Sequence, residues 1–420
     1  MEELGRRAVL TAGLATALGL AACDSPTPVA EPAFDPHDWN AVRALFPLDP
    51  KLVHMAAFVL ATHPKPVQEA IERHRRGLDL DTDWYLHAND GPREDAVRAA
   101  AAAYLGGRPE QVALTDSTTM GLGLLYSGLR VRPDQDVVTS THDFVAHHRA
   151  LDALSHRTGA PVRKIALYDD PRAATEADVV TRLRAAIAPN TRVVGVTWVH
   201  SGTGVRLPVP AIAAMLAEVN AGRAPDDRAL LCVDGVHGFG AVDLDVAGLG
   251  CDFLSTGTHK WLFGPRGTGL LWGRAWDALA PVIPSFEADD APGGIGRTPG
   301  GYHSFEHRWA VLEAFELHRG IGRDRIAQRV AVQATRLKAG LATVPSVRLV
   351  TPDDPAMSAG IVCCEVDGVD AVTARGALRE AGVVASVTPY AQQYLRFGPS
   401  IVTTPAQVDE VVGAVRALRP

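Results

Sequence analysis

The strongest constraint on the fold is an alternation that begins near residue 64, where short apolar runs rich in β-branched residues are followed by longer amphipathic stretches. This pattern predicts strands joined by crossover helices in a mostly parallel sheet. The apolar runs are nearly continuous, which is typical of strands covered on both faces. We therefore expect an α/β fold with a large, seven-stranded sheet sandwiched by helices. The predicted strands are residues 111–114, 136–140, 162–167, 192–198, 229–233, 252–254 and 269–272.

A stretch rich in glycine and proline at residues 291–301 interrupts the alternation. Because such stretches mark loops, we expect a domain boundary there, with a large domain and its N-terminal arm at residues 41–300. Residues 301–420 are then predicted to form a small C-terminal α+β domain. Its expected helices are residues 306–319, 324–344, 369–381 and 405–418, and its expected strands are residues 360–366, 383–387 and 395–397.

Residues 1–22 are expected to be an export signal. Arg6 and Arg7 resemble a Tat signal, and they precede an uncharged stretch that is short for a membrane span. The residues that end in Cys23 resemble a lipobox, whose cysteine carries a lipid. Residues 23–40 are rich in proline and predict a tether. We expect an exported protein, either periplasmic or anchored to the membrane through lipid on Cys23. A frayed N-terminal helix is the alternative interpretation.

Composition narrows the partners. The chain has 420 residues, a formal net charge of -7 and no basic run, so it lacks the charge pattern of a nucleic-acid-binding protein. A small-molecule partner is expected instead. The cysteines after Cys23 lie mostly in apolar runs and are expected to be buried, with neither a disulfide framework nor a metal site.

Two segments that follow predicted strands carry the most specific signal. Asp234 ends the run Cys232-Val233-Asp234, and Lys260 ends the run Thr258-His259-Lys260 after the next strand. Ligands of open α/β sheets bind at the carboxyl ends of the strands, so we expect both side chains in one crevice. A turn aspartate that caps its own loop is the alternative for Asp234.

This pairing resembles the class V aminotransferase family of fold-type I enzymes that depend on pyridoxal 5'-phosphate (PLP), and the resemblance runs from about residue 50 to the end of the chain. It implies that Lys260 binds PLP as a Schiff base and that Asp234 keeps the pyridine nitrogen protonated. It also implies that His237 hydrogen-bonds the phenolic oxygen of PLP and that His142 stacks on the ring.

Ser117, Thr118 and Thr119 lie between a predicted strand and a predicted helix, where backbone N–H groups and hydroxyls can bind the phosphate. Ordinary N-capping is the alternative. Desulfurases of the family use a serine where this chain has Gly257. The residues that remain to replace that serine are Thr256, Thr258 and His259.

The resemblance assigns two more residues to cofactor binding. Ser201 lies in the stretch that reaches the oxygen side of the PLP ring, where desulfurases carry asparagine. Thr298 lies where dimers of the family reach across to the phosphate of the neighbouring subunit, so a homodimer is expected. His147 and His148 are expected to be solvated helix residues and not ligands.

Arg396 matches the arginine motif of the family, and its planar guanidinium suits a substrate α-carboxylate. A surface salt bridge is the alternative. Glu306 and His307 are unusually polar for their place, and they are either further substrate contacts or an ordinary polar helix start.

No cysteine lies between Asp367 and Arg396, which disfavours desulfuration, since that reaction needs a cysteine on a loop upstream of the arginine. Within the family the chain resembles the branch that includes isopenicillin N epimerase and the exported PLP enzymes of pyoverdine maturation. We expect a PLP enzyme that acts outside the cytoplasm on the amine of an amino acid or an amino-acid-derived metabolite, by transamination or a related modification. The alternatives are a PLP-dependent epimerase or lyase and, from another class, a non-catalytic lipid-anchored binding protein on the same fold.

Overall fold

A computed structural model describes residues 34–419 of the chain. The predicted export signal, Cys23 and most of the predicted tether lie outside the described residues. Helix α1 (Trp39–Ala44) begins inside the last residues of that predicted tether, where the side chain of Asp38 accepts a hydrogen bond from the N–H of Asn40. Within residues 34–419, no helix has both the length and the apolar character needed to cross a bilayer.

A seven-stranded sheet forms the centre of the large domain, in the order β2-β8-β7-β6-β5-β3-β4. Every strand is parallel to its neighbours except β8, which runs antiparallel to both β2 and β7. This arrangement confirms the expected α/β fold. The strands are β2 (Val112–Thr115), β3 (Asp136–Ser140), β4 (Val162–Ile165), β5 (Thr191–Thr197), β6 (Leu230–Asp234), β7 (Phe253–Gly257) and β8 (Gly269–Gly273).

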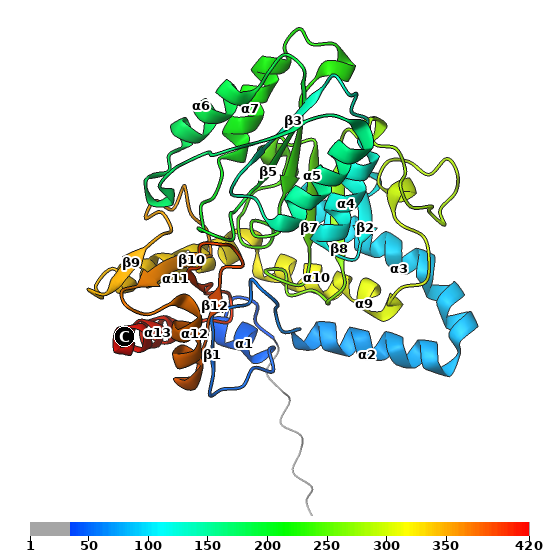
Figure 1. The fold of residues 1–420 in the computed structure, drawn as a ribbon. Coiled ribbons are helices and arrows are strands. Elements are labelled where there is room, and N and C mark those ends of the chain that lie inside the picture. Colours follow the sequence, from blue (N-terminus) through cyan, green and yellow to red (C-terminus); the bar gives the residue numbers. More distant parts are fainter. Residues whose placement is uncertain (1–33, 420) are drawn as a thin grey trace, which may run out of the picture. The chain divides into compact units, whose positions relative to one another are not determined.

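Helices cover both faces of this sheet (Figure 1). Successive strand residues point to opposite faces, so Val194 packs in one core cluster and Val193 in another. The first cluster includes residues of α3 (Thr82–Leu105), α6 (Glu176–Ala186), α7 (Val209–Asn220) and α10 (Val311–Ile321). The second includes residues of α4 (Thr118–Gly128) and α5 (Val145–Thr158). Burial on both sides explains why the strand sequences are almost wholly apolar.

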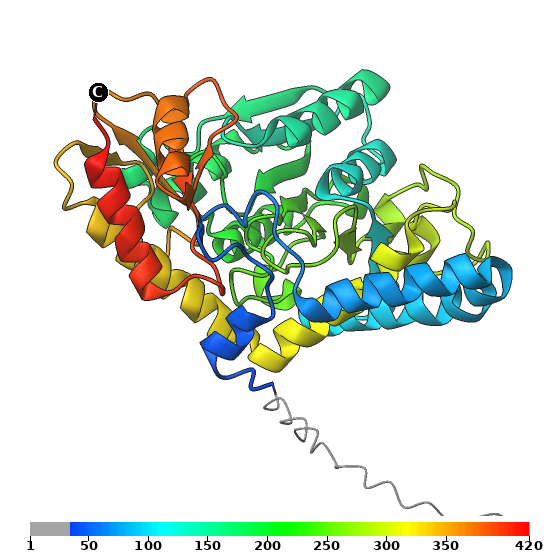
Figure 2. The ribbon, with the colours of Figure 1, turned by 90° about the horizontal axis from the view of Figure 1, so that it is seen from below.

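The C-terminal part is built on a four-stranded antiparallel sheet in the order β12-β13-β10-β9. Its strands are β9 (Val347–Leu349), β10 (Val362–Val366), β12 (Ser386–Val387) and β13 (Leu395–Phe397), and its helices are α11 (Arg323–Leu341), α12 (Ala371–Glu380) and α13 (Pro405–Ala417). The N-terminal arm, drawn in blue, lies beside this orange and red part of the chain (Figure 2). Its strand β1 (Val53–His54) pairs with β11 (Val383–Val384).

The boundary between the two parts differs from the expected one at residue 301. Helix α10 and the short helix α9 (Phe305–Trp309) pack against α2 (Lys65–Leu80) and α3. Val311 and Phe315 of α10 are buried in the core beneath the large sheet. The Gly/Pro-rich stretch is therefore a loop of the large domain, and the C-terminal part begins near α11.

Candidate active site

A cavity of about 230 Å³ lies where β5 and β6 end and α4 begins. It occupies the expected place, at the carboxyl ends of parallel strands. Phe58, Phe144 and Pro389 give it an apolar wall. The predicted site residues that line it are Ser117, Thr118, Thr119, His142, Ser201, Asp234, His237, His259, Lys260 and Arg396.

Asp234 is the last residue of β6, and its carboxylate is buried. One oxygen accepts a hydrogen bond of 3.1 Å from the backbone N–H of Val236. Within residues 34–419, neither Asp234 nor Lys260 forms an ion pair within 4.0 Å, although both line the same cavity. Burial raises the pKa of Asp234 to about 6 and lowers the pKa of Lys260 to about 8, because each charge loses water. A cationic group on a ligand would remove the desolvation cost at Asp234.

Three histidines line the cavity, and burial lowers the pKa of each, which favours the neutral form. Burial, followed by the nearby His200, lowers the pKa of His142 to about 4. The ring of His142 lies flat on that of Tyr168, with centroids 3.8 Å apart and planes 8° from parallel. Burial and the charge of Lys260 hold the pKa of His237 well below its usual value. A neutral imidazole can accept or donate a hydrogen bond to a ligand.

The start of α4 supplies the expected hydroxyls. Ser117 is the N-cap, and its Oγ accepts a hydrogen bond of 3.0 Å from the N–H of Met120. Thr118 Oγ1 is buried and has no partner among the described residues. A Cβ atom placed on Gly257 would lie 2.8 Å from the ring of His259 and 3.2 Å from Thr118 Oγ1. His259 therefore fills the space beside the helix start that a side chain at position 257 would need.

Arg396 lies on β13, and its own chain engages much of its guanidinium. Nη1 donates to the carbonyl oxygen of Ser201 at 3.0 Å, and Nη2 donates to the Val387 carbonyl at 2.9 Å and to the Ser386 hydroxyl at 3.0 Å. The ring of Phe58 lies 5.1 Å from the guanidinium carbon. In the described part of the chain no carboxylate pairs with Arg396, so the predicted alternative of a surface salt bridge is wrong.

Buried polar atoms without a partner show what the cavity can hold. A buried polar atom without a partner is costly, so a polar ligand that satisfies these atoms would be stabilised in the cavity. PLP carries a phosphate, a ring nitrogen and a phenolic oxygen. These groups can satisfy hydroxyl, imidazole and carboxylate groups placed in this way. The residues present therefore fit PLP. The unpartnered atoms among the described cavity residues are Thr118 Oγ1, His142 Nε2, Thr197 Oγ1, His237 Nδ1, His259 Nδ1 and Arg396 Nε.

The model of the family described as Aminotransferase class-V matches residues 92–392. The chain belongs to this family. It is therefore an enzyme of the class-V aminotransferases, which depend on PLP. It is 27% identical over 404 residues to isopenicillin N epimerase of Streptomyces clavuligerus, covering 91% of this chain and 98% of the relative. It is 26% identical over 359 residues to a cysteine desulfurase of Cereibacter sphaeroides, covering 77% and 86%.

Solved structures of the same class share the fold. A mutant of the protein C-DES, with glycine covalently linked to its PLP cofactor, superposes with a TM-score of 0.81 at 20% identity, covering 90% of this chain and 99% of that one. The cysteine desulfurase CsdA from Escherichia coli superposes with a TM-score of 0.76 at 20% identity, covering 90% and 97%.

Two predicted cofactor contacts do not line the cavity. The Thr258 hydroxyl is fully buried and hydrogen-bonds that of Thr268. Thr298 is also buried, where its hydroxyl accepts from the N–H of Leu114 at 3.2 Å and donates to the carbonyl of Gly294 at 3.2 Å. Both hydroxyls are used inside their own chain, because each lies behind a strand end and not on the cavity side. A contact of Thr298 with a neighbouring subunit stays a prediction.

Other polar residues near the site have local partners. The Thr256 hydroxyl is buried and donates to the carbonyl of Gly257. Glu306 accepts a hydrogen bond of 3.1 Å from Ser304, and Nδ1 of His307 donates to the carbonyl of Arg266 at 3.1 Å. Neither Glu306 nor His307 lines the cavity. They fit the polar helix start that was their alternative interpretation.

The expectation that His147 is solvated is wrong. His147 is fully buried, and its Nε2 shares a hydrogen bond of 2.7 Å with the hydroxyl of Tyr126. Gly195 of β5 makes room for this pair, since a Cβ there would lie 2.6 Å from the tyrosine oxygen. His148 is half-buried and donates to the carbonyl of Ser140 at 2.8 Å. The two adjacent histidines thus point to different sides of α5.

A polar layer behind His142 was missed from the sequence. The Tyr168 hydroxyl shares hydrogen bonds with His200 Nδ1 at 2.8 Å and with the hydroxyl of Thr203 at 2.9 Å. Asp143, also buried, accepts from the N–H of Thr197 at 2.8 Å and so joins the ends of β3 and β5. These contacts fix the surface on which His142 stacks. The one sequence signal for these contacts is the run of polar residues that follows each strand.

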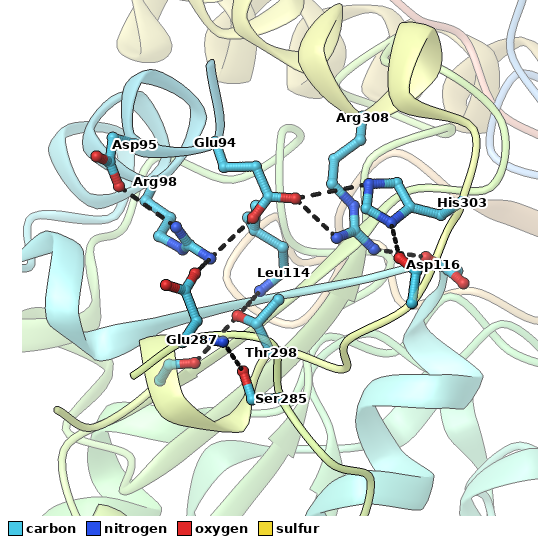
Figure 3. Close-up of polar contacts among 12 residues, drawn as sticks. Glu94, Asp95, Arg98, Leu114, Asp116, Ser285, Glu287, Thr298, His303 and Arg308 are labelled. Carbon is cyan, nitrogen blue, oxygen red and sulfur yellow. Dashed lines mark hydrogen bonds and ion pairs between the residues drawn. The ribbon is translucent and has the colours of Figure 1, made fainter. Parts of the chain in front are cut away.

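A buried network of ion pairs supports the helix start from outside the cavity (Figure 3). Arg308 donates to Asp116, directly before Ser117, at 3.1 Å and to Glu94 at 2.9 Å. Glu94 also accepts from Arg98 at 2.9 Å, and His303 lies 3.5 Å from it. Glu94 and both arginines are buried, so each depends on the others to offset lost hydration.

Proposed function

We propose that this chain is a PLP-dependent enzyme that acts on the amine of an amino acid or an amino-acid-derived metabolite, with Lys260 as the residue that binds the cofactor. One observation carries the proposal: Lys260 lies in the same cavity as the buried Asp234, and burial lowers its pKa to about 8. A lysine that loses its proton this readily is suited to bond a carbonyl and later to move a proton.

When bound, PLP supplies an electron sink that weakens the bonds of the substrate carbon next to the amine. The residues of the chain have separate tasks around it. Asp234 would hold the cofactor at its ring nitrogen and keep that nitrogen protonated, His142 would contact the ring, and the start of α4 would bind the phosphate. Lys260 would act as the base that takes the proton from that substrate carbon and as the acid that returns it. Arg396 orients the substrate carboxylate.

The bond that reacts depends on the pose of the substrate. We favour transamination or a related modification, and the similarity to isopenicillin N epimerase makes epimerisation the second candidate. Desulfuration does not fit. The four described cysteines are buried, none of them lines the cavity, and burial raises the pKa of Cys363 to about 12. A buried thiol of this kind is a poor nucleophile.

The test is product analysis by mass spectrometry, with a panel of amino acids and peptide metabolites, with and without an α-keto acid, in D2O. A transaminase produces more than one equivalent of keto acid per active site only when an acceptor is present, because the acceptor must take the amino group from the cofactor. An epimerase incorporates deuterium and inverts the substrate without an acceptor. Turnover in either reaction should be lost in Lys260→Ala. Full turnover in that variant would overturn the proposal, and PLP binding without any product would favour the non-catalytic binding protein.

We also propose that the protein works outside the cytoplasm, with lipid on Cys23 as its only membrane attachment. The twin arginines and the lipobox-like residues support this proposal. A route for folded proteins suits an enzyme that must acquire its cofactor before export. Cell fractionation and the mass of the mature N-terminus test it. A cytoplasmic protein that retains residues 1–22 would contradict it.

A homodimer is proposed as the working form. Large apolar side chains are exposed at the junction of α2 and α3, at Leu80 and Trp84, and in the loop before α9, at Phe286 and Tyr302. An exposed apolar surface of this kind is typical of a face that binds another subunit. Light scattering with Trp84→Glu tests it: the wild type is expected to be dimeric and the variant to dissociate.

A further inference from the structure

Tyr390, in the loop between β12 and β13, lines the cavity beside Arg396. Its hydroxyl shares a hydrogen bond of 2.7 Å with Ser201 Oγ. Gly202 gives the ring its place, since a Cβ there would lie 3.0 Å from the Tyr390 ring. The neighbouring carbonyl of Ser201 accepts from Arg396 Nη1. Ser201 thus joins the loop after β5 to both Tyr390 and Arg396.

The hydroxyls of Ser201 and Tyr390 carry one hydrogen more than their mutual hydrogen bond uses. Two hydroxyls carry two hydrogens, and one of them makes the bond between Ser201 and Tyr390. Within residues 34–419, neither hydroxyl makes another hydrogen bond, so one hydrogen is left for a ligand. Arg396 has three of its five N–H groups engaged by Ser201, Ser386 and Val387. The guanidinium alone therefore offers few donors to a carboxylate, which has about four acceptor sites.

We propose that Tyr390 is a substrate-binding residue: Ser201 donates to Tyr390, and Tyr390 donates to the α-carboxylate that Arg396 attracts. This inference rests on the proposed function, and it adds a residue that sets the preference for a substrate with a free carboxylate. Ser201 has only 7% of its surface exposed, whereas Tyr390 is more open to the cavity, which suits this direction. Burial raises the pKa of Tyr390 to about 12, so the phenol keeps its proton at neutral pH.

The test compares ligands with and without a carboxylate on the PLP-loaded enzyme. Each of the twenty standard amino acids is titrated while the visible absorbance is recorded, and the tightest one is paired with the amine that lacks its carboxylate. In Tyr390→Phe, the half-saturating concentration of the amino acid should rise at least about tenfold, since a hydrogen bond to a charged group is lost. That of the amine should change less than about twofold.

Tyr394→Phe is the matched control, because Tyr394 lies in the same segment, does not line the cavity and makes no side-chain hydrogen bond within residues 34–419. It should leave both titrations unchanged. Equal weakening of amino acid and amine in Tyr390→Phe, or no weakening, would overturn the inference and leave Tyr390 a structural residue.

Failure of the proposed function has a different signature. A wild-type protein that gains no visible band with PLP would overturn both ideas. If the wild type binds PLP but no amino acid changes its spectrum, the proposed role of Tyr390 in binding a substrate carboxylate would be overturned, whereas PLP binding by Lys260 would stand.

Discussion

Glu94 is predicted to stabilise the large domain through the ion-pair network behind the helix start. Glu94→Gln keeps the size of the side chain and removes its charge. The side chain of Glu94 is 11% exposed, and those of its partners Arg98 and Arg308 are 3% and 7% exposed. The substitution therefore leaves two buried guanidinium groups with fewer acceptors, which is the costly way to break a buried ion pair.

The expected loss in the free energy of unfolding depends on which carboxylate partners Arg98 and Arg308 keep in the variant. Breaking a buried pair costs about 3–5 kcal/mol when one charge is left alone. Here Arg98 keeps Glu287 at 2.8 Å and Arg308 keeps Asp116 at 3.1 Å. We therefore expect the lower end, about 3 kcal/mol. For a chain of this length the entropy of unfolding is on the order of 0.8 kcal/mol/K, so the melting temperature should fall by about 3–5 °C.

Differential scanning calorimetry of the cofactor-free protein measures this change, with Asp95→Asn as the matched control. Asp95 lies on the same helix and pairs with the same Arg98 at 3.4 Å, but its side chain is 76% exposed. An exposed pair contributes less than about 1 kcal/mol, so this variant should melt within about 1 °C of the wild type. Equal losses in the two variants, or no loss in Glu94→Gln, would refute the reasoning that burial makes the network important.

Three further predictions concern the cavity. The rate at which cofactor-free protein takes up PLP should rise with pH and level off above about 8, since burial lowers the pKa of Lys260 to about 8 and the amine is neutral above it; a rise that continues to pH 10 would contradict this. Asp234→Asn should lower kcat/KM by about tenfold to a hundredfold, because the amide cannot hold the ring nitrogen protonated; unchanged steady-state kinetics would argue against its role. His142→Ala should raise the dissociation constant of PLP about threefold to tenfold in an absorbance titration, whereas Tyr168→Phe, which keeps the ring behind His142, should change it less than about twofold.

The large sheet could be predicted because its strands are buried on both faces. That burial produces apolar runs such as Leu230–Asp234, which are visible without knowledge of neighbours. Strands β1 and β9 have only two and three residues, so they leave no pattern of this kind and were not predicted. The strand predicted at residues 383–387 is divided into the two short strands β11 and β12. The boundary was placed too early because the sequence shows that α10 is amphipathic but not which surface covers its apolar face.

The candidate site could be predicted where a residue follows a strand end, as Asp234 and Lys260 do. Thr258 has the same position in the sequence, yet its hydroxyl turns away from the cavity toward Thr268. The direction of a single side chain depends on packing that sequence spacing does not contain. Tyr390 was missed because it lies in a short loop without a recognisable motif. Its place in the site depends on a hydrogen bond with Ser201, which is distant in the sequence.

The central claim is that Lys260 binds PLP, and the most direct test is to trap that bond. The protein is mixed with PLP, reduced with borohydride, digested and mapped by mass spectrometry. The visible band should disappear on reduction, and the phosphopyridoxyl group should be found on the peptide that contains Lys260, with none in Lys260→Ala. Label on Lys51, Lys65, Lys164 or Lys338 in place of Lys260, or no label at all, would contradict the account.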